Sequence, residues 1–249
     1  MLSVLIVSQA VGLAGMAVVA LSTGGRAGGA DLLLGAAGGI AGGAGVAMLY
    51  RGLASGTMAL VAPVTGVVAA IVPVVVGVAL GDRPGRLQFA GVALAVVAVA
   101  LLSSSKPRAG VRFTARTALL ACGAGAAFGL FYIALARTAP AAGFWPLVTA
   151  RGASVTAFAI ALLAQRAALT AGQAGWVLLA ATGVFDVSAN ALYLIAVHNG
   201  LLSIVAVLVS LYPAATVACS LLFLGERLRA LQIASVGVAL AAVTLITAG

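Results

Sequence analysis

Nine stretches of this sequence are apolar over about 20 residues, the length that an α-helix needs to span the hydrocarbon core of a bilayer. Only α-helices and closed barrels satisfy every backbone N–H and C=O group inside a membrane. We therefore predict nine transmembrane helices and an all-α integral membrane fold. The predicted spans are residues 2–21, 31–53, 57–80, 87–104, 114–136, 144–165, 175–198, 201–223 and 230–248.

Composition excludes a soluble protein. The chain of 249 residues is 64% hydrophobic and 7% charged, whereas soluble domains contain about 25% charged residues. Its net charge of +9 comes from thirteen Lys and Arg residues, which lie mainly between the apolar stretches. Basic loops orient membrane proteins, and no basic run is interleaved with aromatic residues as a single-strand binding surface requires. No nucleic-acid partner is therefore expected.

The chain contains an internal repeat, because residues 191–245 restate residues 47–101 with a shift of 144 positions. The same shift aligns the last four predicted spans with the first four. The span at 114–136 has no counterpart, since that counterpart would precede residue 1. We expect a first repeat of four helices at 1–105, without its first helix, and a second repeat of five helices at 114–249. Two explanations stay open: the protein evolved without that helix, or the true start of the chain lies upstream of Met1. Repeats of five helices would enter the membrane in opposite senses, as the inverted repeats of secondary transporters do.

Short motifs at matching places in the two repeats resemble the EamA-type branch of the drug/metabolite transporter superfamily. The motifs are Gly81-Asp82-Arg83 with Leu87-Gln88, Gly225-Glu226-Arg227 with Leu231-Gln232, and Ser210-Leu211-Tyr212-Pro213-Ala214. The resemblance covers essentially the whole chain. It implies ten helices in two five-helix repeats around a central cavity, cytoplasmic termini, and movement of small metabolites, often export of amino acids. It also implies a multi-pass protein of the bacterial inner membrane.

Loop charges predict an orientation that differs from the one this resemblance implies. If the loops alternate sides, one side collects eight basic residues and the other collects four. The positive-inside rule then places the loop at 103–116 in the cytoplasm and the C-terminus outside. The eight are Arg51, Lys106, Arg108, Arg112, Arg116, Arg166, Arg227 and Arg229, and the four are Arg26, Arg83, Arg86 and Arg137.

Polar residues inside the predicted spans are the candidate substrate-binding residues, since charges there usually face the protein interior or a water-filled path. Thr182, Asp186, Asn190 and Tyr193 follow one another at spacings of four, four and three, which places them on one helix face. Arg151 and Asp186 lie roughly 10 Å and 14 Å below the same membrane face at 1.5 Å per residue, so an arginine side chain can reach the carboxylate. The full candidate set is Arg151, Thr182, Asp186, Asn190, Tyr193 and Tyr212.

Two interpretations of Arg151 and Asp186 stay open at this stage. In the first, a buried ion pair locks neighbouring helices together. In the second, Arg151 meets a substrate carboxylate while Asp186 meets an amino group or carries a proton. Proton coupling through Asp186 requires the pair to open, because a permanent arginine contact keeps the carboxylate ionised. His198 is expected at a helix interface, and Asp82 and Glu226 in loop ion pairs with the arginines that follow them.

Small residues carry structural expectations. Gly35, Gly39 and Gly43 recur every fourth residue, a spacing that lets two membrane helices pack closely. Cys122 and Cys219 lie in apolar stretches and are expected to fill the protein interior. Neither a disulfide framework nor a metal site is expected from two separated cysteines.

The function indicated is alternating-access transport, in the direction of export, of a small polar metabolite such as an amino acid or a related amphiphile. The partners are a small-molecule substrate, the bilayer and, by the second interpretation, protons; no cofactor is expected and no pattern indicates an oligomeric state. A lipid-linked-substrate flippase or a multidrug exporter of the same fold is the alternative, followed by a non-transporting accessory subunit. An enzyme is disfavoured, because metal-assisted chemistry needs clustered carboxylates and the four acidic residues are far apart.

Overall fold

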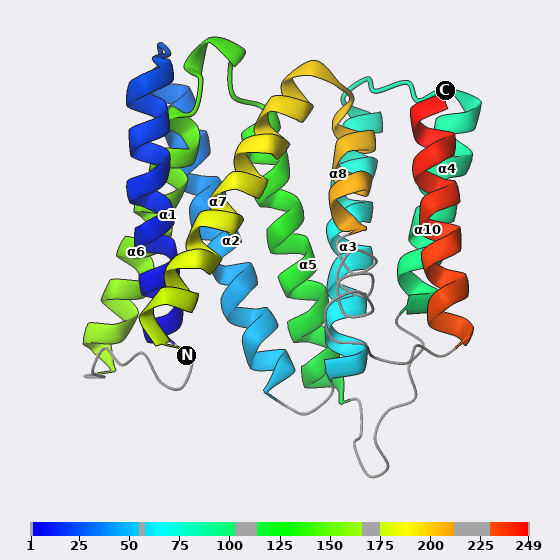
Figure 1. The fold of residues 1–249 in the computed structure, drawn as a ribbon, viewed down its shortest axis with the longest axis horizontal. Coiled ribbons are helices and arrows are strands. Elements are labelled where there is room, and N and C mark those ends of the chain that lie inside the picture. Colours follow the sequence, from blue (N-terminus) through cyan, green and yellow to red (C-terminus); the bar gives the residue numbers. More distant parts are fainter. Residues whose placement is uncertain (1, 55–57, 103–113, 166–174, 212–229, 249) are drawn as a thin grey trace. The chain divides into compact units, whose positions relative to one another are not determined.

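The computed structural model describes residues 2–54, 58–102, 114–165, 175–211 and 230–248, and these residues are mostly helical (Figure 1). Each α-helix lies at one predicted apolar stretch, because a backbone in lipid must make its hydrogen bonds within the same segment. The helices are α1 (Leu2–Thr23), α2 (Gly29–Leu53), α3 (Met58–Ala79), α4 (Arg86–Leu102), α5 (Ala115–Ala136), η1 (Pro140–Ala142), α6 (Trp145–Ala164), α7 (Gly175–Asn199), α8 (Leu202–Ser210) and α10 (Ala230–Ala248).

Five of the described helices are long and apolar enough to cross a membrane, so this is a multi-pass integral membrane protein. These helices are α1, α2, α5, α6 and α7. Shorter apolar stretches occupy Val64–Ala79, Arg86–Ala98 and Ile233–Ile246. The predicted span at 201–223 coincides with α8 at its start and otherwise lies outside the described residues.

The chain divides into two compact units. Unit 1 comprises Met1–Gly43 and Phe131–Asn199, and unit 2 comprises Ala44–Leu130 and Gly200–Gly249. Each unit therefore combines residues from the predicted first repeat with residues from the predicted second repeat. Helices α2 and α5 contribute one end to each unit.

In unit 1, helix α2 packs closely against α6 along its glycine stripe. A Cβ atom added at Gly39 would overlap the backbone of Ala150, and one at Gly35 would overlap the backbone of Pro146. A Cβ at Gly43 would make ordinary contact with Ser154. The close packing predicted from the spacing of these glycines is confirmed.

Helices α1 and α7 also cross at close range in unit 1. A Cβ atom at Gly183 of α7 would overlap the carbonyl oxygen of Ser8, and one at Gly12 of α1 would lie 3.4 Å from the carbonyl oxygen of Gly183. Small residues at the crossing let the two backbones approach. The crossing brings the residues around Gly12 next to the turn of α7 that precedes Asp186.

Two turns meet at one end of unit 1. Gly25 has φ of 127° and Gly143 has φ of 58°, values that favour glycine, and a Cβ at Gly25 would lie 2.8 Å from Ala142 O. Asp31 joins the same turns, since its carboxylate accepts hydrogen bonds from Gly28 N at 2.9 Å and from Ala139 N at 2.8 Å. The turn before α2 is thereby tied to the turn after α5.

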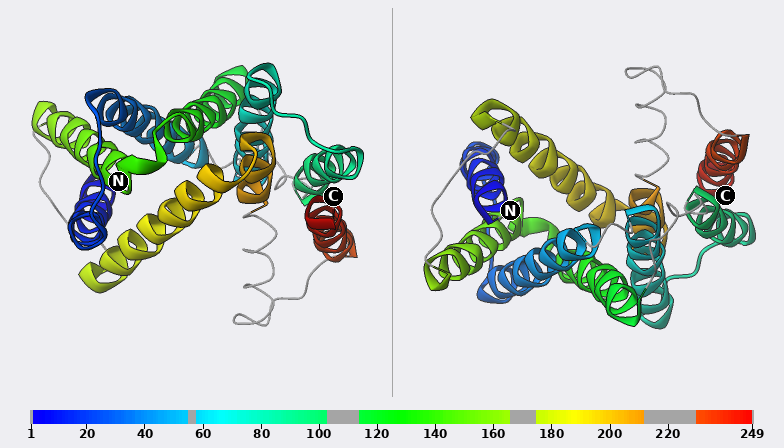
Figure 2. Two further views of the ribbon diagram at one scale, coloured as in Figure 1. Left: turned by 90° about the horizontal axis from the view of Figure 1, so that it is seen from above. Right: turned by 90° about the horizontal axis from the view of Figure 1, so that it is seen from below.

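In unit 2, α10 packs along α4, and α8 packs on α3 (Figures 1 and 2). Small and branched side chains fill their shared core, including Ala95, Ala98, Val207 and Ala242. Cys122 on α5 is exposed, so its predicted place in the interior is wrong: the neighbouring Ala121 and Ala124 face inward instead. Cys219 lies outside the described residues.

Asp82 caps a helix in unit 2. Its Oδ2 accepts a hydrogen bond from the backbone N–H of Ser203 at 2.8 Å, at the first turn of α8. The expected ion pair with Arg83 is absent from the described residues. The physical reason is that the first N–H groups of a helix lack partners and carry partial positive charge. Glu226, the counterpart of Asp82, lies outside the described residues.

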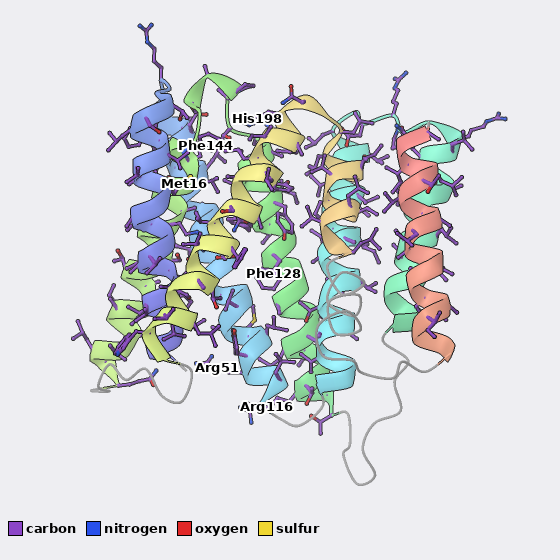
Figure 3. All side chains as sticks on the ribbon, in the orientation of Figure 1. Met16, Arg51, Arg116, Phe128, Phe144 and His198 are labelled. Carbon is purple, nitrogen blue, oxygen red and sulfur yellow. The ribbon has the colours of Figure 1, made fainter. Side chains whose placement is uncertain are left out.

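Arg51 and Arg116 lie at the same end of unit 2 (Figure 3). One ends α2 and the other opens α5, so the intervening chain of two spans returns to the same end. This placement agrees with the charge assignment made from the sequence, in which both arginines were on the more basic side.

Candidate functional site

The ion pair between Arg151 of α6 and Asp186 of α7 is the centre of the candidate site. Arg151 Nη1 lies 2.6 Å from Asp186 Oδ2, and the side chains are 7% and 48% exposed. The pairing predicted from their similar depth in the membrane is confirmed. Arg151 is thus held inside unit 1, whereas Asp186 lies partly open at its surface.

Gln9 of α1 is a second partner of the buried arginine. Arg151 Nη1 donates a hydrogen bond to Gln9 Oε1, and Ser154 Oγ lies 3.3 Å from the same oxygen. Ser154 Oγ also lies 3.0 Å from Arg151 O. Three helices therefore meet in one polar cluster, which we call the Arg151 cluster: Gln9, Arg151, Ser154 and Asp186.

Asn190 extends this cluster along α7. Its Nδ2 donates to Asp186 O at 2.8 Å and lies 3.3 Å from Asp186 Oδ1. The two side chains stand one helical turn apart on the same face. The face that they share presents a carboxylate and a carboxamide, which can accept hydrogen bonds from an amino group and donate one to an oxygen.

The other predicted residues of α7, Thr182 and Tyr193, have hydrogen-bond partners outside the ion pair. Thr182 is exposed, and its hydroxyl donates to Leu178 O in its own helix at 2.9 Å. Tyr193 is buried; its hydroxyl donates to Tyr132 O at 2.9 Å, and the centroids of the two rings are 4.7 Å apart. Tyr212 lies outside the described residues. Of the six predicted residues, the structure brings Arg151, Asp186 and Asn190 together.

His198 lies near the end of unit 1 that carries Phe144 (Figure 3). Its Nε2 is 3.3 Å from Thr138 Oγ1, and that hydroxyl lies 2.7 Å from Leu135 O. The imidazole thus joins the end of α7 to the turn after α5, as expected for a histidine at a helix interface. In the described part of the chain no three His, Cys, Asp or Glu side chains are grouped as metal ligands.

Comparison with known proteins identifies the family. The model of the EamA-like transporter family matches residues 115–248, more than half of the chain. The chain belongs to the EamA-like transporter family. Proteins of this family are transporters rather than enzymes, so a small-molecule substrate and a membrane setting follow. The resemblance read from the motifs is confirmed.

The fold of this EamA-like transporter also occurs among solved structures. One, described as the crystal structure of a protein, superposes with a TM-score of 0.82 at 16% sequence identity. The match covers 99% of this chain and 87% of the other. At this identity it shows a shared fold. No curated protein matches the sequence.

Sequence reasoning missed two members of the Arg151 cluster in this EamA-like transporter. Gln9 is a polar residue within the apolar stretch 2–21, and polar side chains inside lipid must find partners. That rule could have marked it. Its partner on α6 lies 142 residues away in sequence, so neither helical spacing nor depth alone selects the pair. Ser154 follows Arg151 by three residues, which places both on one face of α6.

Proposed function

We propose that this chain transports a small zwitterionic metabolite, an amino acid or a related amphiphile, across the bacterial inner membrane by alternating access and in the direction of export. The Arg151–Asp186 pair would be its binding site. A substrate ammonium group would bind Asp186 and Asn190, and a substrate carboxylate would bind Arg151. Family membership supports a transporter, and the arrangement of this pair supports the class of substrate.

The observation that carries the proposal is the unequal exposure of the two charges. Asp186 is 48% exposed and Arg151 is 7% exposed, so an incoming solute meets the carboxylate first. A cationic group of the substrate would therefore bind Asp186 first and weaken its ion pair with Arg151. Once freed, the guanidinium can bind a carboxylate through two parallel hydrogen bonds. Opening of the pair would also let Asp186 take up a proton, which is how we propose that proton coupling would occur.

We also propose that the two repeats are arranged as an inverted pair. The 144-residue shift maps α1 to α6, α3 to α8 and α4 to α10. Each of these helices packs against its own counterpart, which is what an approximate twofold axis between the repeats would produce. Alternating access in such transporters is a rocking of one repeat or bundle against the other.

Exchange in proteoliposomes tests the function. Vesicles loaded with the common amino acids should exchange them for deuterated amino acids added outside, measured by mass spectrometry. Asp186→Asn should abolish exchange of the transported species. The double variant Arg151→Met/Asp186→Asn removes both charges and should remain inactive. Ser188→Ala on the same helix removes a hydroxyl that donates to Val184 O of its own helix, and this variant should exchange normally.

The double variant separates the two interpretations of the ion pair. A pair that only locks helices can be replaced by neutral residues with little loss, so its double variant would retain exchange. Retained exchange would therefore contradict a substrate-binding role. Absence of exchange for every amino acid in the wild type would contradict the proposed substrate class.

A further inference from the structure

Gln9 is a second partner of Arg151, which could keep the guanidinium in place when the ion pair with Asp186 breaks. Gln9 is buried in the apolar helix α1, and its Oε1 accepts a hydrogen bond from Arg151 Nη1. The same nitrogen contacts Asp186. Nη1 of Arg151 thus contacts two acceptors: the neutral Gln9, which is buried in unit 1, and the charged Asp186, which is partly exposed.

The remaining donors of Arg151 have no partner among the described residues. A guanidinium group carries five N–H donors in a planar fork, and the side-chain contacts of Arg151 in that part of the chain both use Nη1. A carboxylate can accept hydrogen bonds from further donors of this fork, Nε and Nη2. In this arrangement Nη1 holds the guanidinium in place, while its other N–H donors bind the substrate carboxylate.

We propose that Gln9 is a positioning residue, which holds the Arg151 guanidinium in place when the ion pair with Asp186 breaks. Arg151 then binds the substrate carboxylate without rearranging. This inference rests on the proposed function for the identity of the substrate. Ser154 adds a second polar group beside this oxygen, because its hydroxyl lies 3.3 Å from Gln9 Oε1.

Neutrality explains why a carboxamide suits this position. Arg151 and Asp186 together carry no net charge, and Gln9 and Ser154 add none. A glutamate at position 9 would become a second counter-ion for Arg151 and would repel an incoming carboxylate. A methionine would match the length of Gln9 but would remove the acceptor, leaving Asp186 as the side-chain partner of the guanidinium among the described residues.

The first experiment needs no substrate. It compares the melting temperatures, in detergent micelles, of four full-length proteins: the wild type, Gln9→Met, Asp186→Asn and Gln9→Met/Asp186→Asn. If Gln9 holds Arg151, it is the remaining partner of a buried charge once Asp186 is neutralised. Gln9→Met should then lower the melting temperature about twice as far in the Asp186→Asn background as in the wild type, a coupling expected of residues that share a partner. Strictly additive changes would overturn the inference.

The second experiment measures exchange of the amino acid that the wild type moves best and of its carboxamide. Gln9→Met should raise KM for the amino acid about tenfold, the effect of one hydrogen bond, and leave the maximal rate and the KM for the carboxamide unchanged. Gln9→Glu should also raise KM for the amino acid, and Gln9→Asn should recover part of the loss. Ser8→Ala is the matched control on α1, because the Ser8 hydroxyl donates to Leu5 O of its own helix.

The two experiments test the role of Gln9 separately from the transport of an amino acid. Equal loss for the acid and the carboxamide, or a fall in maximal rate alone, would overturn the role of Gln9 while leaving transport established. If the wild type moves no amino acid, the proposed substrate class fails, and the melting-temperature cycle still decides whether Gln9 holds Arg151.

Discussion

Replacing Gly39 with alanine should lower the melting temperature of the protein in detergent micelles, whereas the same replacement at Gly152 should raise it. A Cβ atom at Gly39 would overlap the backbone of Ala150, and one at Gly152 would meet nothing within 4 Å. Alanine in a helix is favoured over glycine by about 1 kcal/mol. Overlap in a packed interior costs about 1–3 kcal/mol and sometimes more, and here backbone must yield rather than a flexible side chain.

A larger side chain at Gly39 should also disturb the candidate site. Ala150 directly precedes Arg151, so moving α6 away from α2 displaces the guanidinium relative to Asp186. We expect Gly39→Leu to abolish exchange in proteoliposomes and Gly152→Ala to leave it intact. A Gly39→Ala protein that melts at or above the wild-type temperature would show that α2 and α6 do not pack as described.

The second large effect is an asymmetry between the two halves of the ion pair. Asp186→Asn leaves a buried positive charge without its counter-ion, and stranding a charge in this way costs about 3–5 kcal/mol. Arg151→Met leaves a carboxylate that is 48% exposed, for which we expect about 1 kcal/mol, the usual range of exposed ion pairs. Asp186→Asn should therefore melt well below Arg151→Met.

Combining the two substitutions should recover much of the stability lost in Asp186→Asn, because no charge is then left unpaired. Thermal unfolding of the four proteins in the same detergent measures this. Equal destabilisation by the two single variants, or no recovery in the double variant, would contradict the unequal burial of the pair.

The helices could be predicted from the sequence because their bounds follow from a local property. The apolar stretch at 114–136 became α5, Ala115–Ala136, and the stretch at 144–165 became α6, Trp145–Ala164. Length and hydropathy suffice when a segment must satisfy its own backbone. The glycine stripe of α2 was readable for a similar reason, since a four-residue spacing defines a face without knowledge of its neighbour.

The site could be predicted only in part, because most of its contacts join distant helices. Arg151 and Asp186 could be paired from their depth and opposite charge. Gln9 offered no charge to match and no second polar residue at helical spacing, so its partner depended on which helices cross. Asp31 and Asp82 show a related difficulty: both carboxylates accept hydrogen bonds from backbone N–H groups of distant turns, and the sequence does not encode which backbone group comes near.

The proposed substrate site requires that the polar side of α7 face an aqueous path rather than lipid. Thr182 and Asn190 flank Asp186 on that side, one turn away in each direction, whereas Val184 lies roughly opposite, since two residues turn about 200°. Thr182 and Val184 are both exposed, the latter by 52%, so exposure alone does not distinguish them. Single cysteines at these positions, in a protein carrying Cys122→Ser and Cys219→Ser, can report which side meets water.

The deciding measurement is labelling of these thiols in proteoliposomes by a charged methanethiosulfonate reagent present on both sides of the membrane. We predict fast labelling of Thr182→Cys and Asn190→Cys, slowed by the transported amino acid, and little labelling of Val184→Cys. Equal labelling at all three positions, or none at Thr182→Cys and Asn190→Cys, would contradict a substrate path along this side of α7.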